Sequence, residues 1–153
     1  MPELIREIIN FLEAQGVILL TTIDEEGFPH SSCKGIVKIE ETGRVYLLDA
    51  YRGATFRNLK RNPRACVSAF NEHKFRGYSL KGRARPVRGD ELSKDILKLW
   101  EKKITARLTD RLLSNVRGQK GHRGHPEALL PEPKYMIVFE VEGVIDLTPP
   151  NLK

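Results

Sequence analysis

The chain has 153 residues, of which 40% are hydrophobic and 30% are charged. This balance is typical of one soluble globular domain with a substantial core and excludes a disordered chain. The apolar runs are shorter than the roughly 20 residues that cross a bilayer, and charged residues interrupt the N-terminal segment where a signal peptide would be apolar. We therefore expect a single cytoplasmic domain over residues 1–153.

The chain is basic, with a net charge of +6. This excess indicates an anionic partner, either a nucleic acid or a phosphate-bearing small molecule, or serves solubility alone. The two cysteines, Cys33 and Cys66, lack the spacing of a metal site and are predicted to be reduced thiols packed on strands.

The hydrophobic pattern predicts strands joined by tight turns, with few helices. A helix with apolar residues at helical spacing is predicted from Leu4 to Gly16, where it would cover one end of a sheet. Three strands then follow as a meander, and a short basic helix separates them from the later strands. The predicted strands occupy residues 17–23, 28–40, 44–49, 65–70, 75–87 and 135–147, and the basic helix occupies residues 55–61.

Two glycines interrupt the strand over residues 75–87. Gly77 and Gly82 indicate a bulge there, or the close approach of a neighbouring backbone or of a ligand. About six strands with two or three helices, connected mainly by tight turns, favour a small antiparallel barrel.

The region after the fifth strand is predicted to be helical and then irregular. Asp90 is the expected N-cap of a helix that places Trp100 on its apolar face, in the core or in a dimer interface. A further helical stretch is predicted near residues 105–116, and residues 117–133 are predicted to form an irregular loop.

The turn between the third strand and the basic helix predicts an anion pocket. Backbone N–H groups at a helix start carry a partial positive charge, the Thr55 hydroxyl adds a donor, and Arg52 adds a planar fork of donors. A phosphate on a cofactor or substrate is the expected occupant.

In the order of its segments the chain resembles the pyridoxamine 5′-phosphate oxidase-like, FMN-binding split barrels, over residues 16–87 and the closing strand. The resemblance rests on Gly27-Phe28-Pro29-His30-Ser31-Ser32, Gly43-Arg44-Val45-Tyr46-Leu47-Leu48-Asp49, Thr55 with Asn58-Leu59, Asn62-Pro63-Arg64, and Gly77 to Gly82. It implies a mainly β fold with flanking helices, a six-stranded antiparallel split β-barrel. It also implies homodimers that hold FMN in clefts at the subunit interface.

Carried over by position, the resemblance implies a set of cofactor-binding residues. Those beside the flavin ring and ribityl chain are Ser31, Ser32, Cys33 and Lys34, and those at the phosphate are Asp49, Arg52, Thr55 and Asn58. Many family members have lysine at the position of Thr55, so Arg52, Arg57 or Lys34 would supply the positive charge here. The arginine-bearing strand and Trp-containing tail of true pyridoxamine phosphate oxidases are not found in residues 142–150, which argues against vitamin B6 oxidation.

The resemblance implies an FMN-dependent oxidoreductase of unknown substrate, in which the flavin carries the hydride and no catalytic residue is assigned. The deazaflavin F420 is an alternative cofactor, since its longer acidic tail suits the positive charge, and a non-catalytic flavin-binding protein is another alternative. A small-barrel nucleic-acid binder is a third, motivated by the basic charge and by the aromatic residues Phe56, Phe70, Phe75 and Tyr78.

Two histidines in the predicted loop, His122 and His125, lack cysteine or acidic partners at a metal-ligand spacing. No metal site is therefore predicted. The predicted loop over residues 117–133 either covers the cofactor cleft or is an ordinary surface loop.

Overall fold

The computed structural model describes residues 3–49, 53–116, 118 and 135–153. The predictions for Arg52 and for the loop with His122 and His125 lie outside these residues. No helix in the described part of the chain is both long enough and apolar enough to span a membrane.

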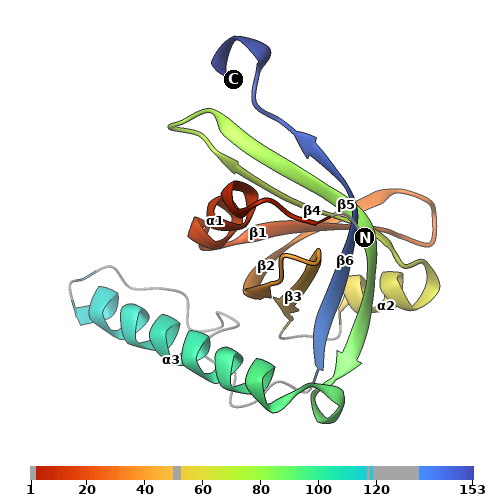
Figure 1. Cartoon of the computed structure of the whole chain (residues 1–153). Coiled ribbons are helices and arrows are strands. Elements are labelled where there is room, and N and C mark those ends of the chain that lie inside the picture. The colour runs from red at the N-terminus through yellow and green to blue at the C-terminus, as the bar shows by residue number, and fades with distance from the viewer. Residues whose placement is uncertain (1–2, 50–52, 117, 119–134) are drawn as a thin grey trace.

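Six strands close into a barrel in the order β1-β2-β3-β6-β5-β4 (Figure 1). All neighbouring strands are antiparallel. This confirms the predicted six-stranded antiparallel barrel. The strands are β1 (Ile18–Ile23), β2 (Pro29–Ile39), β3 (Arg44–Leu48), β4 (Arg64–Asn71), β5 (Arg76–Arg88) and β6 (Tyr135–Asp146).

Three α-helices accompany the barrel: α1 (Arg6–Ala14), α2 (Ala54–Arg61) and α3 (Lys94–Val116). The helical conformation predicted after β5 and near residues 105–116 is confirmed, but the two stretches form one helix, because α3 runs without a break. Asp90 does not cap it, since Asp90 lies in a short 3₁₀ turn (η1, Gly89–Glu91) and pairs with Arg88. The hydroxyl of Ser93 instead accepts a hydrogen bond from the Ile96 N–H at 3.3 Å, as an N-cap does. A second 3₁₀ turn, η3 (Pro150–Leu152), follows β6.

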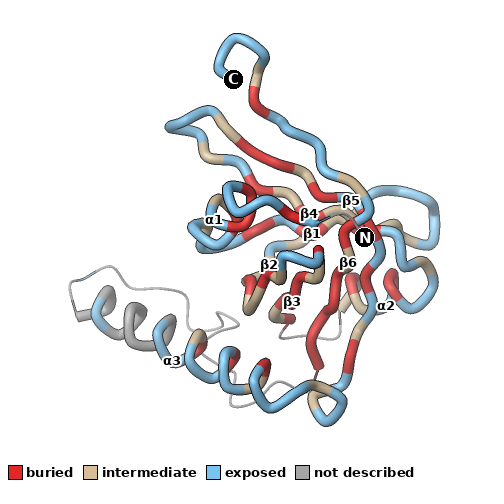
Figure 2. The backbone as a smooth tube through the Cα atoms, in the orientation of Figure 1, coloured by how far each residue is buried: buried red, intermediate tan, exposed pale blue. Residues whose placement is uncertain are grey.

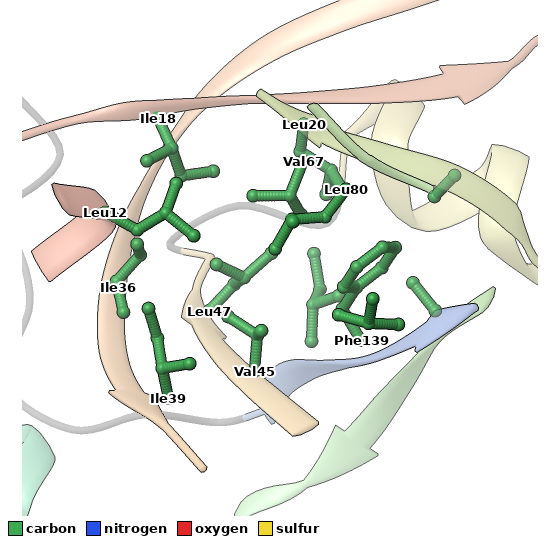
Figure 3. Close-up of a cluster of buried hydrophobic side chains, with 14 of the residues drawn as sticks. Leu12, Ile18, Leu20, Ile36, Ile39, Val45, Leu47, Val67, Leu80 and Phe139 are labelled. Carbon is green, nitrogen blue, oxygen red and sulfur yellow. The ribbon is translucent and has the colours of Figure 1, made fainter. Parts of the chain in front are cut away.

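Apolar side chains from all around the sheet fill the barrel interior (Figure 3). Val45 and Leu47 of β3 alternate with outward residues and meet Phe139 of β6. Leu12 of α1 is fully buried and reaches the same cluster, so α1 closes one end of the barrel as predicted. Figure 2 shows the buried positions along the strands.

A second apolar cluster lies outside the barrel, under the first half of α3. Trp100 is only 2% exposed and packs with Tyr46, Met136 and Val138. The first half of β6 is therefore buried on both faces, by the barrel interior and by α3. The prediction of a buried Trp100 is confirmed.

The glycines of β5 lie where neighbouring backbones come close, as predicted. A Cβ at Gly82 would lie 2.0 Å from the Glu140 carbonyl oxygen, and one at Gly77 would lie 2.5 Å from the Ala69 carbonyl oxygen. The pairing of β5 with β6 shifts register beside Gly82, so that Glu142 is the extra residue of a bulge.

Candidate functional site

Two hydroxyl groups meet where β2 passes the start of α2. The Ser32 Oγ lies 2.9 Å from the Thr55 Oγ1, and the Thr55 residue is buried. Ser32 stands opposite the fully buried Leu20 of β1, so its side chain points to the inner side of the sheet. The N-cap of α2 is Gly53, and among the described residues no side chain caps the helix. The first turn of α2, whose N–H groups have no i−4 partner within the helix itself, therefore lies next to two hydroxyl groups.

A buried ion pair lies on the same side of β2. The Lys34 Nζ is 2.6 Å from the Asp49 Oδ1, and the two side chains are 11% and 3% exposed. The Tyr135 hydroxyl donates a hydrogen bond to the other carboxylate oxygen, Oδ2. The ring of Phe56 meets that of Tyr135 edge-on, with centroids 5.2 Å apart. Asp49 thus holds Lys34 in place rather than offering a donor to an anion.

Asn58 joins α2 to the barrel. Its Nδ2 donates to the Thr22 Oγ1 at 3.1 Å, and its Oδ1 accepts from Arg61 at 3.3 Å. Arg61 also donates to the Ile23 carbonyl oxygen. Asn58 and Thr22 are both buried, so this polar contact is part of how the helix packs.

Ser31 and Cys33 point to the opposite, outer face of β2. The Ser31 Oγ lies 2.8 Å from the Thr21 Oγ1, and Cys33 stands opposite Leu19, which is 46% exposed. Both cysteines are free thiols, but the expectation that both are packed is wrong for Cys33, which is exposed, while Cys66 is half-buried. The cause is the alternation of a strand, which turns the side chains of neighbouring residues to opposite faces.

The structure thus divides the predicted site residues. It brings together Ser32, Lys34, Asp49, Thr55 and Asn58 on the α2 side of β2, and it places Ser31 and Cys33 across the sheet.

Sequence reasoning missed Tyr135 and Thr22, the partners of Asp49 and Asn58. The sequence offered only a weak signal for these two residues: each is a polar residue near the end of a predicted strand. Among the described residues, no group of three His, Cys, Asp or Glu side chains could hold a metal ion.

A family model described as pyridoxamine 5′-phosphate oxidase matches residues 4–141. The curated proteins contain no significant match.

Solved structures of the same fold cover nearly the whole chain. A putative pyridoxamine 5′-phosphate oxidase from Lactobacillus delbrueckii is 18% identical with a TM-score of 0.63, over 95% of each chain. A pyridoxamine 5′-phosphate oxidase-related, FMN-binding protein from Nostoc punctiforme is 15% identical with a TM-score of 0.57, over 92% of this chain and 78% of that one. HutZ, the heme storage protein from Vibrio cholerae, is 20% identical with a TM-score of 0.55, over 94% of each chain.

Proposed function

The chain belongs to the pyridoxamine 5′-phosphate oxidase family, and we propose that it binds FMN, with the flavin phosphate between β2 and the start of α2. The observation that supports this most is the pair of hydroxyl groups, Ser32 and Thr55, at the start of α2. A phosphate with a charge of about −1.5 to −2 is stabilised by several such donors and by the helix dipole.

The donor set of this region fits a phosphate. Lys34 has three N–H donors, of which one bonds Asp49 and the other two have no partner among the described residues. Under this proposal Ser32, Thr55 and Lys34 bind the phosphate, while Asp49 and Tyr135 position Lys34. Arg52 is proposed as a further donor on the strength of its sequence position alone.

Bound flavin would supply hydride transfer, so the proposed activity is that of an oxidoreductase of unknown substrate. The contribution of the protein is to hold the phosphate and to limit access of water and substrate to the ring. A protein that only binds flavin would keep the same phosphate contacts without turnover.

F420 is the second candidate cofactor. The same fold occurs in an F420 reductase that is 14% identical with a TM-score of 0.55, over 93% of this chain and 98% of that one. The net charge of +6 suits a longer acidic tail.

Nucleic-acid binding has weaker support. Of the aromatic residues that motivated it, Tyr78 is buried and Phe56 packs against the core. Phe70 and Phe75 are exposed, but they stack edge-on with each other at the β4–β5 turn. The aromatic residues therefore form no continuous stacking surface for bases.

We also propose that the protein is a homodimer that pairs through the outer face of the sheet. One line of paired residues crosses this face without a charge: Cys33, Leu19, Ser68, Ser79 and Ile145. Leu19 and Ile145 are each nearly half exposed, which favours their burial against a second copy.

An absorption spectrum of the purified protein tests the proposed function, together with release of the chromophore and its identification by mass. A flavin spectrum and the mass of FMN are expected, whereas the mass of F420 would identify the second candidate cofactor. A folded sample that is colourless and binds neither FMN nor F420 in calorimetry would contradict the proposal.

A further inference from the structure

A hollow of about 400 Å³ opens on the outer face of the barrel, and β1, β2, β4, β5 and β6 contribute to its lining. Its volume lies in the range of small-molecule sites. The lining residues are Thr21, Thr22, Ile23, Pro29, Arg64, Ala65, Cys66, Lys81, Gly82 and Glu142.

The hollow lies across the sheet from the proposed phosphate region. Thr21, Cys66 and Lys81 are register partners on adjacent strands, so their side chains share one face. The next residue, Thr22, also borders the hollow, but its hydroxyl accepts a hydrogen bond from Asn58 of α2 on the other side of the strand. The two regions are therefore separated by the thickness of β1.

Positive charge around the hollow exceeds negative charge. Arg64 of β4 stands directly opposite Arg83 of β5, and like charges in that position are destabilising. The only carboxylate in the lining, that of Glu142, accepts a hydrogen bond from the Arg83 Nε at 3.0 Å. Within the described part of the chain, neither Arg64 nor Lys81 forms an ion pair. An anion in the hollow would balance these two cations.

The bulge of β6 makes room for one of the cations. The side chain of Lys81 lies over Gly143, where a Cβ would come within 3.1 Å of the Lys81 Cε. Ile23, Pro29 and Ala65 add an apolar part to the wall. The hollow thus combines two cationic groups with an apolar surface.

We propose that this hollow binds a small organic anion, a carboxylate or phosphate monoester on a ring or short hydrocarbon. The guanidinium of Arg64 binds the anion through its planar donors, and Lys81 adds a point charge. The apolar body lies against Ile23 and Pro29. This site is independent of the flavin proposal, because it uses neither Ser32 nor Thr55.

The thiol of Cys66 lines the hollow and reports on its occupancy. In a Cys33→Ser variant, Cys66 is the only thiol, and its alkylation by iodoacetamide is followed by mass. Phenyl phosphate at ten times its Kd is expected to slow alkylation about tenfold, since only the free fraction reacts. Benzyl alcohol, which has the ring without the charge, is expected to leave the rate unchanged.

Replacement of both cations, Arg64→Gln with Lys81→Gln, is expected to abolish the protection. A charge-matched control, Lys74→Gln with Arg85→Gln, removes two exposed cations outside the hollow. In this control, phenyl phosphate should still protect Cys66. Circular dichroism checks that both variants fold.

Three results would overturn the proposal: equal protection by benzyl alcohol, protection that survives loss of Arg64 and Lys81, or a Cys66 that does not react in the folded protein. FMN affinity measured on the same samples separates the two proposals. If the protein does not bind FMN but phenyl phosphate still protects Cys66, only the flavin proposal is contradicted. If the protein binds FMN but phenyl phosphate does not protect Cys66, only the proposal of an anion site in the hollow is contradicted.

Discussion

At the scale of single residues, two hydroxyl groups and one buried ion pair define what the space between β2 and α2 can bind. Ser32 and Thr55 offer neutral donors, and Lys34 offers a cation whose charge is shared with Asp49. The pair is held by Tyr135, which bonds the second oxygen of the carboxylate. A buried charge that keeps its partners is tolerated, and one that loses them is costly.

Removal of the hydroxyl groups tests the phosphate contacts. Ser32→Ala and Thr55→Ala are each expected to weaken FMN binding by about 1.5–3 kcal/mol, the usual value of a hydrogen bond to a charged group. Riboflavin, which lacks the phosphate, should bind each variant as it binds the wild type in calorimetry.

A matched control comes from Ser68, whose hydroxyl is 2.8 Å from that of Ser79 on the outer face. Ser68→Ala breaks an equivalent hydroxyl pair away from α2 and should leave FMN affinity unchanged. Equal weakening of FMN binding in Ser68→Ala and Ser32→Ala would place the phosphate elsewhere.

Replacement of the buried carboxylate tests the role of Asp49. Asp49→Asn leaves the Lys34 ammonium almost buried without its counter-charge, and we expect a loss of about 3–5 kcal/mol in the free energy of unfolding in urea. The double variant Lys34→Met with Asp49→Asn should recover part of that loss.

The ion pair Arg88–Asp90 provides the control, because both of its side chains are more than 60% exposed. The same change from aspartate to asparagine can be made there without leaving a buried charge. Asp90→Asn is expected to change the unfolding free energy by about 1 kcal/mol or less. Similar losses in Asp49→Asn and Asp90→Asn would argue against a structural role for the buried pair.

At the scale of elements, the neighbouring strands constrain β5 at its two glycines. It pairs with β4 and β6 along its length, and its glycines lie where neighbouring carbonyl groups come closest. A backbone carbonyl group cannot move away from an added Cβ as easily as the end of a flexible side chain can. The bulge beside Gly82 also brings Glu142 and Lys81 to the rim of the hollow on the outer face.

A methyl group at Gly82 tests this constraint. Gly82→Ala would place a Cβ 2.0 Å from the Glu140 carbonyl oxygen, so β5 and β6 must separate. We expect a loss of about 1–3 kcal/mol in thermal or urea unfolding, the usual cost of overpacking. Gly16→Ala is the control, because nothing lies within 4 Å of a Cβ there. Two variants of equal stability would show that the strands adjust freely.

At the scale of the whole molecule, the barrel has two kinds of outer surface. One part is covered by α3 through Trp100 and its neighbours. Another part, around Leu19 and Ile145, remains partly exposed and carries no charge across several strands. The first surface is already covered within the chain, and the second is the one we propose pairs with a second copy.

A charge in the middle of the exposed face tests the homodimer. Leu19→Lys is expected to convert the protein from dimer to monomer in light scattering after gel filtration, because a lysine would have to be buried without a partner. Leu152→Lys changes an equally exposed leucine near the C-terminus and should leave the mass unchanged. A wild type that is monomeric at all concentrations would refute the homodimer.

The sequence by itself determined the six strands, α1 and α2, and their order. Apolar runs bounded by turn residues predicted the strands, Gly82 predicted a bulge or a close approach in β5, and the apolar spacing before Gly16 predicted α1. These features are local, because a strand repeats every two residues and a helix every 3.6. The family resemblance also pointed to Ser32 and Thr55 as neighbours of one ligand.

Tertiary structure decided what depends on residues far apart in the chain. Alternation shows that Ser31 and Ser32 face opposite sides, but only barrel closure shows that Ser32 is on the side of α2. The contact between Asp49 and Tyr135 joins residues 86 positions apart, and the first half of β6 is buried on both faces only because α3 returns over it. The hollow at Arg64 and Lys81 likewise arises from strand pairing, which places like charges together regardless of their separation in sequence.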